Sequence, residues 1–159
     1  LAGGVLRRPH MDKLFYIPQR PYLPPGTLRD QIIYPHSKER ITRSDEEIRQ
    51  LLNWVKLDYV EEREKGFDSV NDWNDVLSGG EKQRIAMARL FYHRPLFAIL
   101  DECTSAMSMD VEAELYLKAK ELGITLFTVS HRVSLFKYHE YMISFDGNGN
   151  YELKNLKHD

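Results

Sequence analysis

Cysteine, net charge and long apolar runs are all scarce in this 159-residue chain. Cys103 is the single cysteine, so no internal disulfide can form and we expect a reducing compartment. The net charge of −2 disfavours a broad nucleic-acid-binding face. No apolar run approaches the length of a membrane span, and no signal peptide is recognisable. Because the chain begins at Leu1, we expect a piece of a longer polypeptide, whose other parts can still include membrane spans.

Short apolar runs typical of strands alternate along the chain with segments whose apolar residues have helical spacing. This alternation predicts an α/β fold with a mostly parallel sheet. Strands are predicted at 13–19, ending near Ile17, and as buried runs at 96–100 and 124–129. Helices are predicted at 44–55, 80–92 and 110–123. Loops or irregular segments are expected at 20–30 and 63–75, and a hairpin at 141–154.

Three of the predicted strands lead into polar residues. Ile17 is followed closely by Gln19, Leu100 by Asp101 and Glu102, and Val129 by Ser130 and His131. Ligands of parallel sheets bind beyond the carboxyl ends of the strands, where one carboxylate can hold Mg²⁺ and another can activate water. The set suits metal-assisted phosphoryl transfer, although each residue taken alone also fits a structural role, such as a helix cap.

The segment "LSGGEKQR" at 77–84 opens the second predicted helix. Ser78 and Glu81 have the spacing of a capping box, which by itself predicts only a helix start. Gly79 and Gly80 favour an anion site in addition to a helix start. Because glycine has no side chain, an anion can approach the N–H groups of a helix N-terminus there.

The same segment resembles the signature motif of ATP-binding-cassette (ABC) ATPases, and four further features resemble that family. "LFAILDE" resembles the Walker B strand, "SAMSMD" the D-loop, Gln19 the Q-loop glutamine and His131 the switch histidine. "FYIPQRPY", "GTLRDQIIYP" and "SHRVSLFKYHEY" are similar to the peroxisomal half-transporters of fatty acids and their CoA esters.

The resemblance implies a P-loop NTPase-like ABC ATPase fold with a helical subdomain. Residues 1–159 would be a partial nucleotide-binding domain. Within it, 27–92 would be the helical subdomain, and 93–159 would hold the Walker B, D-loop and switch-histidine core with the C-terminal hairpin.

The resemblance also implies roles for the matching residues. Asp101 and Gln19 would hold Mg²⁺, and Gln19 would also be catalytic. Glu102 would be the general base. His131 would be catalytic through a contact with the γ-phosphate. The residues expected to bind ATP are Ser78, Gly79, Gly80, Gln83, Asp101 and Ser105. The signature residues among them would act on ATP held by the opposite subunit.

Residues 105–110 would line the dimer interface. Ser108 stands where the wider family has aspartate, which leaves open how the two sites communicate.

The function implied is the ATPase motor of a peroxisomal half-transporter that imports long-chain fatty acids or their CoA esters. Its partners would be a second half-transporter, identical or different, its own transmembrane domain and, through that domain, a fatty acyl-CoA, with no nucleic acid. The domain would lie on the cytosolic side of the peroxisomal membrane. Two alternatives are a soluble ABC ATPase acting on nucleic acid or ribosomes, and a non-catalytic dimerising fragment.

The chain contains no G-x-x-x-x-G-K-[ST] run, the Walker A loop that cradles the β- and γ-phosphates. We therefore predict that the isolated 159-residue chain binds ATP weakly and hydrolyses it negligibly, as equilibrium binding and phosphate release would show. Turnover at the rate of a complete ABC ATPase, abolished by Glu102→Gln, would contradict this prediction.

Overall fold

The computed structural model describes residues 3–157, which divide into two compact units. The first unit ends at Val129 and the second begins at Ser130, so the division falls inside the predicted 93–159 segment. Among residues 3–157, none of the helices combines the length and the hydropathy that crossing a membrane requires.

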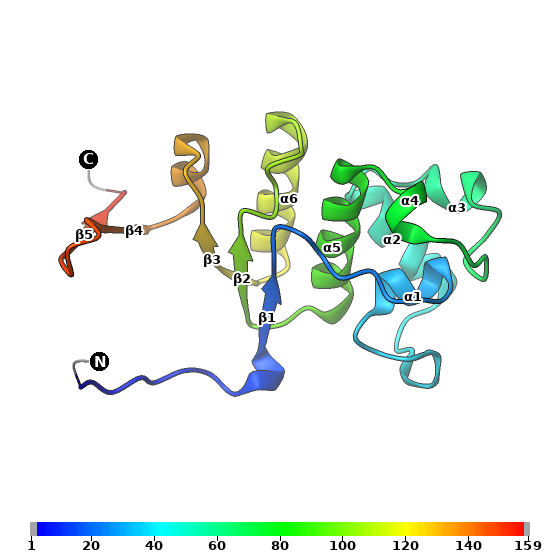
Figure 1. Cartoon of the computed structure of the whole chain (residues 1–159), viewed down its shortest axis with the longest axis horizontal. Coiled ribbons are helices and arrows are strands. Elements are labelled where there is room, and N and C mark those ends of the chain that lie inside the picture. The colour runs from blue at the N-terminus through cyan, green and yellow to red at the C-terminus, as the bar shows by residue number, and fades with distance from the viewer. Residues whose placement is uncertain (1–2, 158–159) are drawn as a thin grey trace. The chain divides into compact units, whose positions relative to one another are not determined.

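The first unit contains a parallel sheet of three strands in the order β1-β2-β3 (Figure 1). The strands are β1 (Leu14–Ile17), β2 (Phe97–Asp101) and β3 (Thr125–Val129). The pairing aligns Ile17 with Leu100, so the carboxyl ends of β1 and β2 lie at the same edge. The predicted parallel α/β fold is confirmed.

Within residues 3–157, six α-helices accompany this sheet. They are α1 (Leu28–Ile33), α2 (Asp45–Trp54), α3 (Val60–Arg63), α4 (Trp73–Val76), α5 (Gly79–His93) and α6 (Met109–Glu121). The three helices predicted from periodicity are confirmed as α2, α5 and α6. The short helices were missed, because periodicity needs more than one turn to show; α1 begins within the predicted loop, at a capping box of Thr27 and Asp30. Two 3₁₀ turns, η1 (Met11–Lys13) and η2 (Lys38–Arg40), complete the unit.

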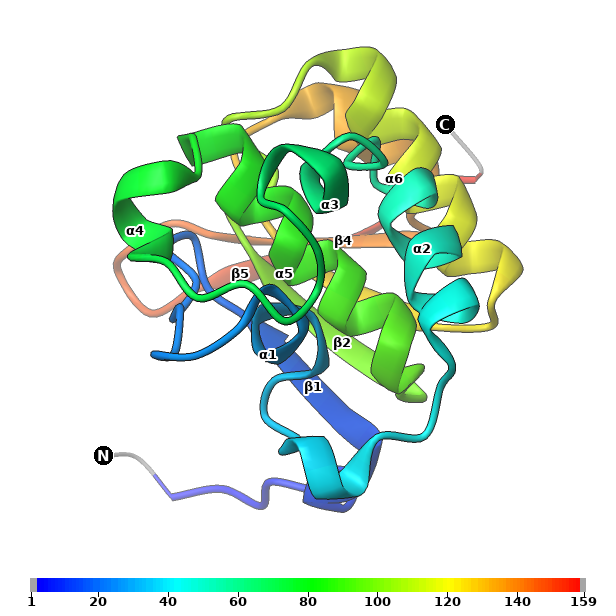
Figure 2. The same cartoon turned by 90° about the vertical axis from the view of Figure 1, so that its right-hand side faces the viewer.

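Helix α5 is the central element of the first unit. It packs against α1 and α2 on one side and reaches β1 on the other (Figures 1 and 2). Ile85, Leu90 and Phe91 are fully buried, as the wide apolar surface of this segment predicts. The predicted helical subdomain at 27–92 includes α1 to α4 and nearly all of α5; its boundaries stay a prediction.

The sheet is buried on one face only, which corrects the prediction that 96–100 and 124–129 are fully buried strands. Ala98 and Leu100 are almost inaccessible, and the Tyr116 hydroxyl of α6 lies 3.2 Å from Thr128 Oγ1 on β3. Phe127 on the opposite face is 60% exposed and Val129 is 46% exposed. The reason is that the described helices cover one face of the sheet. Successive side chains of a strand point to opposite faces, so they alternate between core and solvent.

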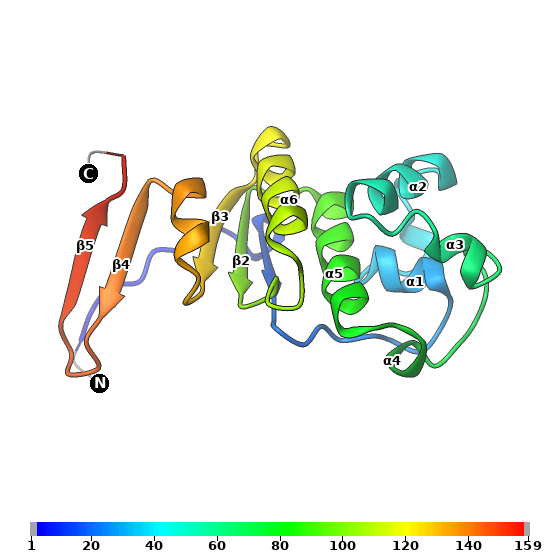
Figure 3. The ribbon, with the colours of Figure 1, turned by 90° about the horizontal axis from the view of Figure 1, so that it is seen from above.

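The second unit is a 3₁₀ helix, η3 (Val133–Tyr138), followed by the antiparallel strands β4 (Tyr141–Phe145) and β5 (Tyr151–Asn155) (Figure 3). Gly147 and Gly149 adopt positive φ in the connecting turn, where a side chain would be strained. The predicted hairpin is confirmed.

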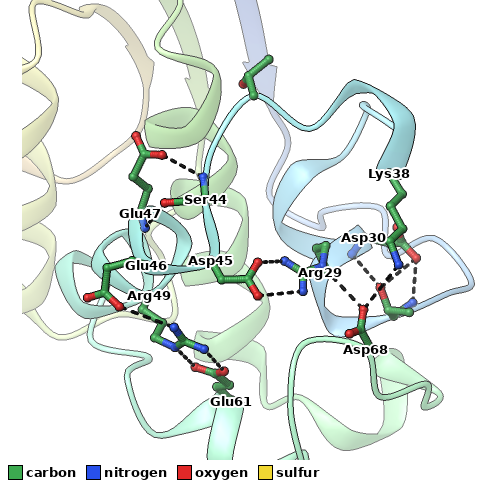
Figure 4. Close-up of polar contacts among 12 residues, drawn as sticks. Arg29, Asp30, Lys38, Ser44, Asp45, Glu46, Glu47, Arg49, Glu61 and Asp68 are labelled. Atoms are coloured by element: carbon green, nitrogen blue, oxygen red, sulfur yellow. Dashed lines mark hydrogen bonds and ion pairs between the residues drawn. The ribbon is translucent and has the colours of Figure 1, made fainter.

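Two arginines that both lie over the Phe67 ring form ion pairs at different degrees of exposure (Figure 4). The Arg29 side chain is 9% exposed; it makes two hydrogen bonds to Asp45 and lies 3.6 Å from Asp68. Its guanidinium also lies over the Phe67 ring at 5.1 Å. Arg49 contacts Glu46 and Glu61 but is 47% exposed, so water screens its ion pairs.

We predict that Arg29→Ala lowers the free energy of unfolding by about 1 to 3 kcal/mol, because a buried side chain with charged partners is removed. The matched control Arg49→Ala should cost clearly less, since solvent already screens the pairs that it removes. Urea denaturation of the chain measures both values. Equal losses in the two variants would contradict the prediction.

Candidate functional site

Two of the predicted strand-end residues lie at one edge of the sheet. Asp101 ends β2, and Gln19 lies two residues after the end of β1, the neighbouring strand. The Tyr16 hydroxyl donates a hydrogen bond of 2.9 Å to Asp101 Oδ2 across these strands. Gln19 is exposed and Asp101 is half-buried, so the edge is open to a ligand.

Glu102 has an unusual backbone for a residue with a side chain. Its φ is +51°, in the left-handed region, while its N–H still donates 2.9 Å to the Val129 carbonyl of β3. The chain therefore turns away from the sheet at Glu102, and the residue is half-buried. Non-glycine residues held in this region gather at functional sites.

His131 lies in the second unit, two residues beyond the end of β3, and it is exposed there. The structure describes this unit by itself, so the predicted placement of His131 beside the carboxylates stays a prediction.

Cys103 is 2% exposed, and burial raises the pKa of its thiol to about 12. A buried thiol with a raised pKa favours a packing role over a nucleophilic one.

The Ser-Gly-Gly segment forms the first turn of α5. Ser78 is the N-cap, and its Oγ accepts from the Glu81 N–H. The N–H groups of Gly79 and Gly80 precede the first intrahelical bond, which Lys82 makes to the Ser78 carbonyl. Ser78 and Gly79 are exposed, whereas a Cβ on Gly80 would lie 3.0 Å from the Ala106 carbonyl oxygen. The turn thus presents an exposed helix N-terminus on one side and packs closely on the other.

Glu81 locks this turn to α3. The carboxylate accepts from the Ser78 N–H at 2.9 Å, from the Arg63 guanidinium at 2.7 Å and from the Tyr59 hydroxyl at 2.6 Å. Glu81 is 5% exposed, and this burial acts to raise its pKa, but the bonds from Arg63, Ser78 and Tyr59 outweigh it and lower the pKa to about 2. The capping box was predicted; the sequence gives no signal for its partners Tyr59 and Arg63, which lie about 20 residues away.

Gln83 and Ser105, both predicted to bind ATP, contact each other. Gln83 Nε2 donates 3.0 Å to Ser105 Oγ, and Gln83 Oε1 accepts 2.8 Å from the Ala106 N–H. Gln83 is 5% exposed, whereas Ser105 is exposed.

The donor set at the sheet edge fits Mg²⁺ better than a transition metal. Among residues 3–157, no three side chains of His, Cys, Asp or Glu gather as a metal cage. Mg²⁺ requires few protein ligands, since water and phosphate oxygens complete its octahedron. The half-buried Asp101 carboxylate and the exposed Gln19 amide supply hard oxygen donors of that kind.

The chain matches one known family of proteins. The family model described as ABC transporter matches residues 7–105. The chain belongs to the ABC transporter family. The ABC-type α/β fold predicted from the sequence is thereby confirmed, and the role of the signature segment stays a prediction.

Relatives narrow the similarity to one subfamily. The ATP-binding cassette sub-family D member 3 proteins of Mus musculus and Homo sapiens are each 60% identical over 162 aligned residues, covering 100% of this chain and 25% of the relative. Sub-family D member 1 of Drosophila melanogaster is 53% identical over 92% of this chain and 20% of its own length. The predicted resemblance to the peroxisomal half-transporters is confirmed, and it extends to the 70-kDa peroxisomal membrane protein. The chain spans about a quarter of the length of these relatives.

A solved structure supports the fold. A bacterial Atm1-family ABC exporter with ATP bound aligns with a TM-score of 0.72 and 24% identity, over 88% of this chain and 25% of the exporter chain.

The Glu81 contacts predict a pH dependence of stability. The pKa of Glu81 is about 2 in the folded chain against an ordinary 4.5, so its contribution is complete above pH 4.5 and is lost as the pH falls toward 2. Glu81→Gln should lower the free energy of unfolding by about 2 to 3 kcal/mol at pH 7, with the difference from wild type shrinking below pH 4.5. Chemical denaturation at a series of pH values measures it.

The control is Glu47→Gln, which changes the same capping-box position of α2 but affects a side chain that is 55% exposed. Its cost should be clearly smaller, because water competes for the bonds of an exposed carboxylate. A Glu81→Gln effect that is constant from pH 7 to pH 2 would contradict the prediction.

Proposed function

We propose that this chain is part of the ATP-hydrolysing motor domain of a peroxisomal ABC half-transporter that imports long-chain fatty acids or their CoA esters. The observation that carries the proposal is the exposed Ser78-Gly79 helix end on the same unit as the Asp101–Glu102 strand end. A helix end of this kind binds phosphate, and the carboxylates serve hydrolysis. The sequence identity of 60% and 53% to sub-family D members supports the assignment to a transporter.

In the proposed reaction, Glu102 is the general base. Its carboxylate accepts a proton from water as the water oxygen attacks the γ-phosphorus and the bond to the ADP oxygen breaks. The backbone bond from Glu102 to Val129 fixes the base at the strand end. His131 contacts the γ-phosphate in this proposal.

Asp101 and Gln19 would hold Mg²⁺, which neutralises charge on the β- and γ-phosphates when it is bound. The Tyr16 hydroxyl takes one acceptor position of Asp101 Oδ2, and a carboxylate offers about four, so the bond leaves room for water or metal. The bond also limits the rotation of the carboxylate.

The helix end would act on the nucleotide of a second copy of the domain. Ser78 Oγ accepts from Glu81 within its own turn, so its hydroxyl proton can be donated to a phosphate oxygen. A Cβ placed on Gly79 would meet no atom within 4 Å, which leaves space for an approaching anion. A dimer of half-transporters, identical or different, each joined to its own transmembrane domain, would thus form two nucleotide sites.

We predict that Glu102→Gln in the full-length protein that carries this chain lowers the rate of ATP hydrolysis at least about 100-fold. ATP binding should persist, because the carboxamide keeps the shape of the side chain. Phosphate release and nucleotide binding would be measured on purified protein, with Glu114→Gln as control; Glu114 is an exposed carboxylate of α6 that pairs with Lys56.

Peroxisomal membranes should contain the full-length protein, and ATP-dependent uptake of a long-chain acyl-CoA should fail in the Glu102→Gln variant. Hydrolysis that survives this substitution would refute the general-base role. Co-purification with ribosomes or nucleic acid, without acyl-CoA uptake, would favour the alternative ABC ATPase.

A further inference from the structure

The side-chain amide of Gln83 is the meeting point of three segments that are far apart in the sequence. Gln83 projects from the second turn of α5 and is 5% exposed. Its Nε2 donates to Ser105 Oγ at 3.0 Å and lies 3.4 Å from the Gln19 carbonyl oxygen, while its Oε1 accepts from the Ala106 N–H at 2.8 Å.

These bonds occupy the polar atoms of the amide. A carboxamide has two N–H donors, and here one reaches the loop after β1, at Gln19, and the other reaches the loop after β2, at Ser105. The acceptor oxygen is bonded to Ala106 of the second loop. The side chain therefore faces protein at each of its ends, and its burial leaves little surface for a nucleotide.

Close backbone packing reinforces the same junction. Gly80 lies one turn before Gln83, and a Cβ on Gly80 would be 3.0 Å from the Ala106 carbonyl oxygen. The loop after β2 is thus held to α5 at two successive turns, once by packing and once by hydrogen bonds. Because α5 is buried continuously from Ile85 to Tyr92, the junction is attached to a well-packed element.

We propose that Gln83 is a positioning residue: its amide couples the Gln19 loop to the Ser105–Ala106 loop and acts on hydrolysis through them rather than by binding ATP. The inference rests on the proposed function for its effect on hydrolysis. An amide is required because a carboxylate of the same shape cannot donate to the Gln19 carbonyl and to Ser105 at once.

The test compares Gln83→Glu with Gln50→Glu in the full-length protein. Gln50 is an exposed glutamine of α2, so the control makes the same chemical change away from the junction. Hydrogen exchange without nucleotide should become faster in Gln83→Glu at both 18–24 and 103–108, because both loops lose their shared partner. The control should match wild type in both segments.

Kinetics separate positioning from binding. Gln83→Glu should lower kcat for ATP hydrolysis about tenfold and leave KM for ATP within about twofold, since the amide does not contact the nucleotide. A double-mutant cycle with Ser105→Ala should be non-additive, with the double variant losing less than the product of the two single losses.

Ser105→Ala also tests the junction from its exposed end, where a folding defect is not expected. It should speed exchange in 18–24 even though Ser105 lies in the other loop. Unchanged exchange in 18–24 for both variants would overturn the proposal, as would a tenfold rise in KM at constant kcat. If the wild-type protein does not hydrolyse ATP, the proposed function fails, while the exchange comparison still decides the junction.

Discussion

The burial of helix α5 is the constraint on which the first unit depends. The helix contacts α1 and α2 as well as β1, so α5 joins these two helices to the sheet. Its first turn must also approach the loop after β2 closely, which is possible because position 80 has no side chain. The exposed helix end and the loop that follows the strand-end carboxylates are therefore held against the same helix.

Three described helices begin at capping boxes, and two of these boxes have clearly different consequences. The capping boxes Ser44–Glu47 and Ser78–Glu81 have the same spacing and the same pair of hydrogen bonds. Glu47 is exposed, so its bonds compete with water, whereas Glu81 is buried and also bonded by Arg63. A buried carboxylate must be paired to be tolerated. The second box therefore fixes the orientation of the Ser-Gly-Gly turn as well as starting the helix.

The sequence predicts the long elements and the chemistry-bearing positions, because both depend on local patterns. The stripe at 44–55 and the apolar run at 96–100 identify α2 and β2, and the glycines at 79 and 80 identify the helix end. Burial of β3 was predicted wrongly, since an apolar run does not reveal whether a second layer covers its other face. The sequence also does not reveal which residues far apart along the chain form hydrogen bonds with each other. Arg63, Tyr59 and Tyr16 carry no motif, and their roles arise from contacts with Glu81 and Asp101 across 18 to 85 positions of sequence.

The backbone at Glu102 links strain to the proposed chemistry. A left-handed conformation costs a residue with a side chain about 1 to 3 kcal/mol, so it persists only where the surroundings enforce it. Here the N–H bond to Val129 holds the residue on one side, and the buried Cys103 and Thr104 hold the chain on the other, with the Thr104 hydroxyl donating to Glu112 of α6. Lys56, Lys65 and Arg94 also have positive φ, so the conformation alone does not mark a general base. At Glu102 it turns the chain out of the sheet directly after Asp101, and this placement supports the proposed role because a fixed carboxylate keeps one position while water attacks.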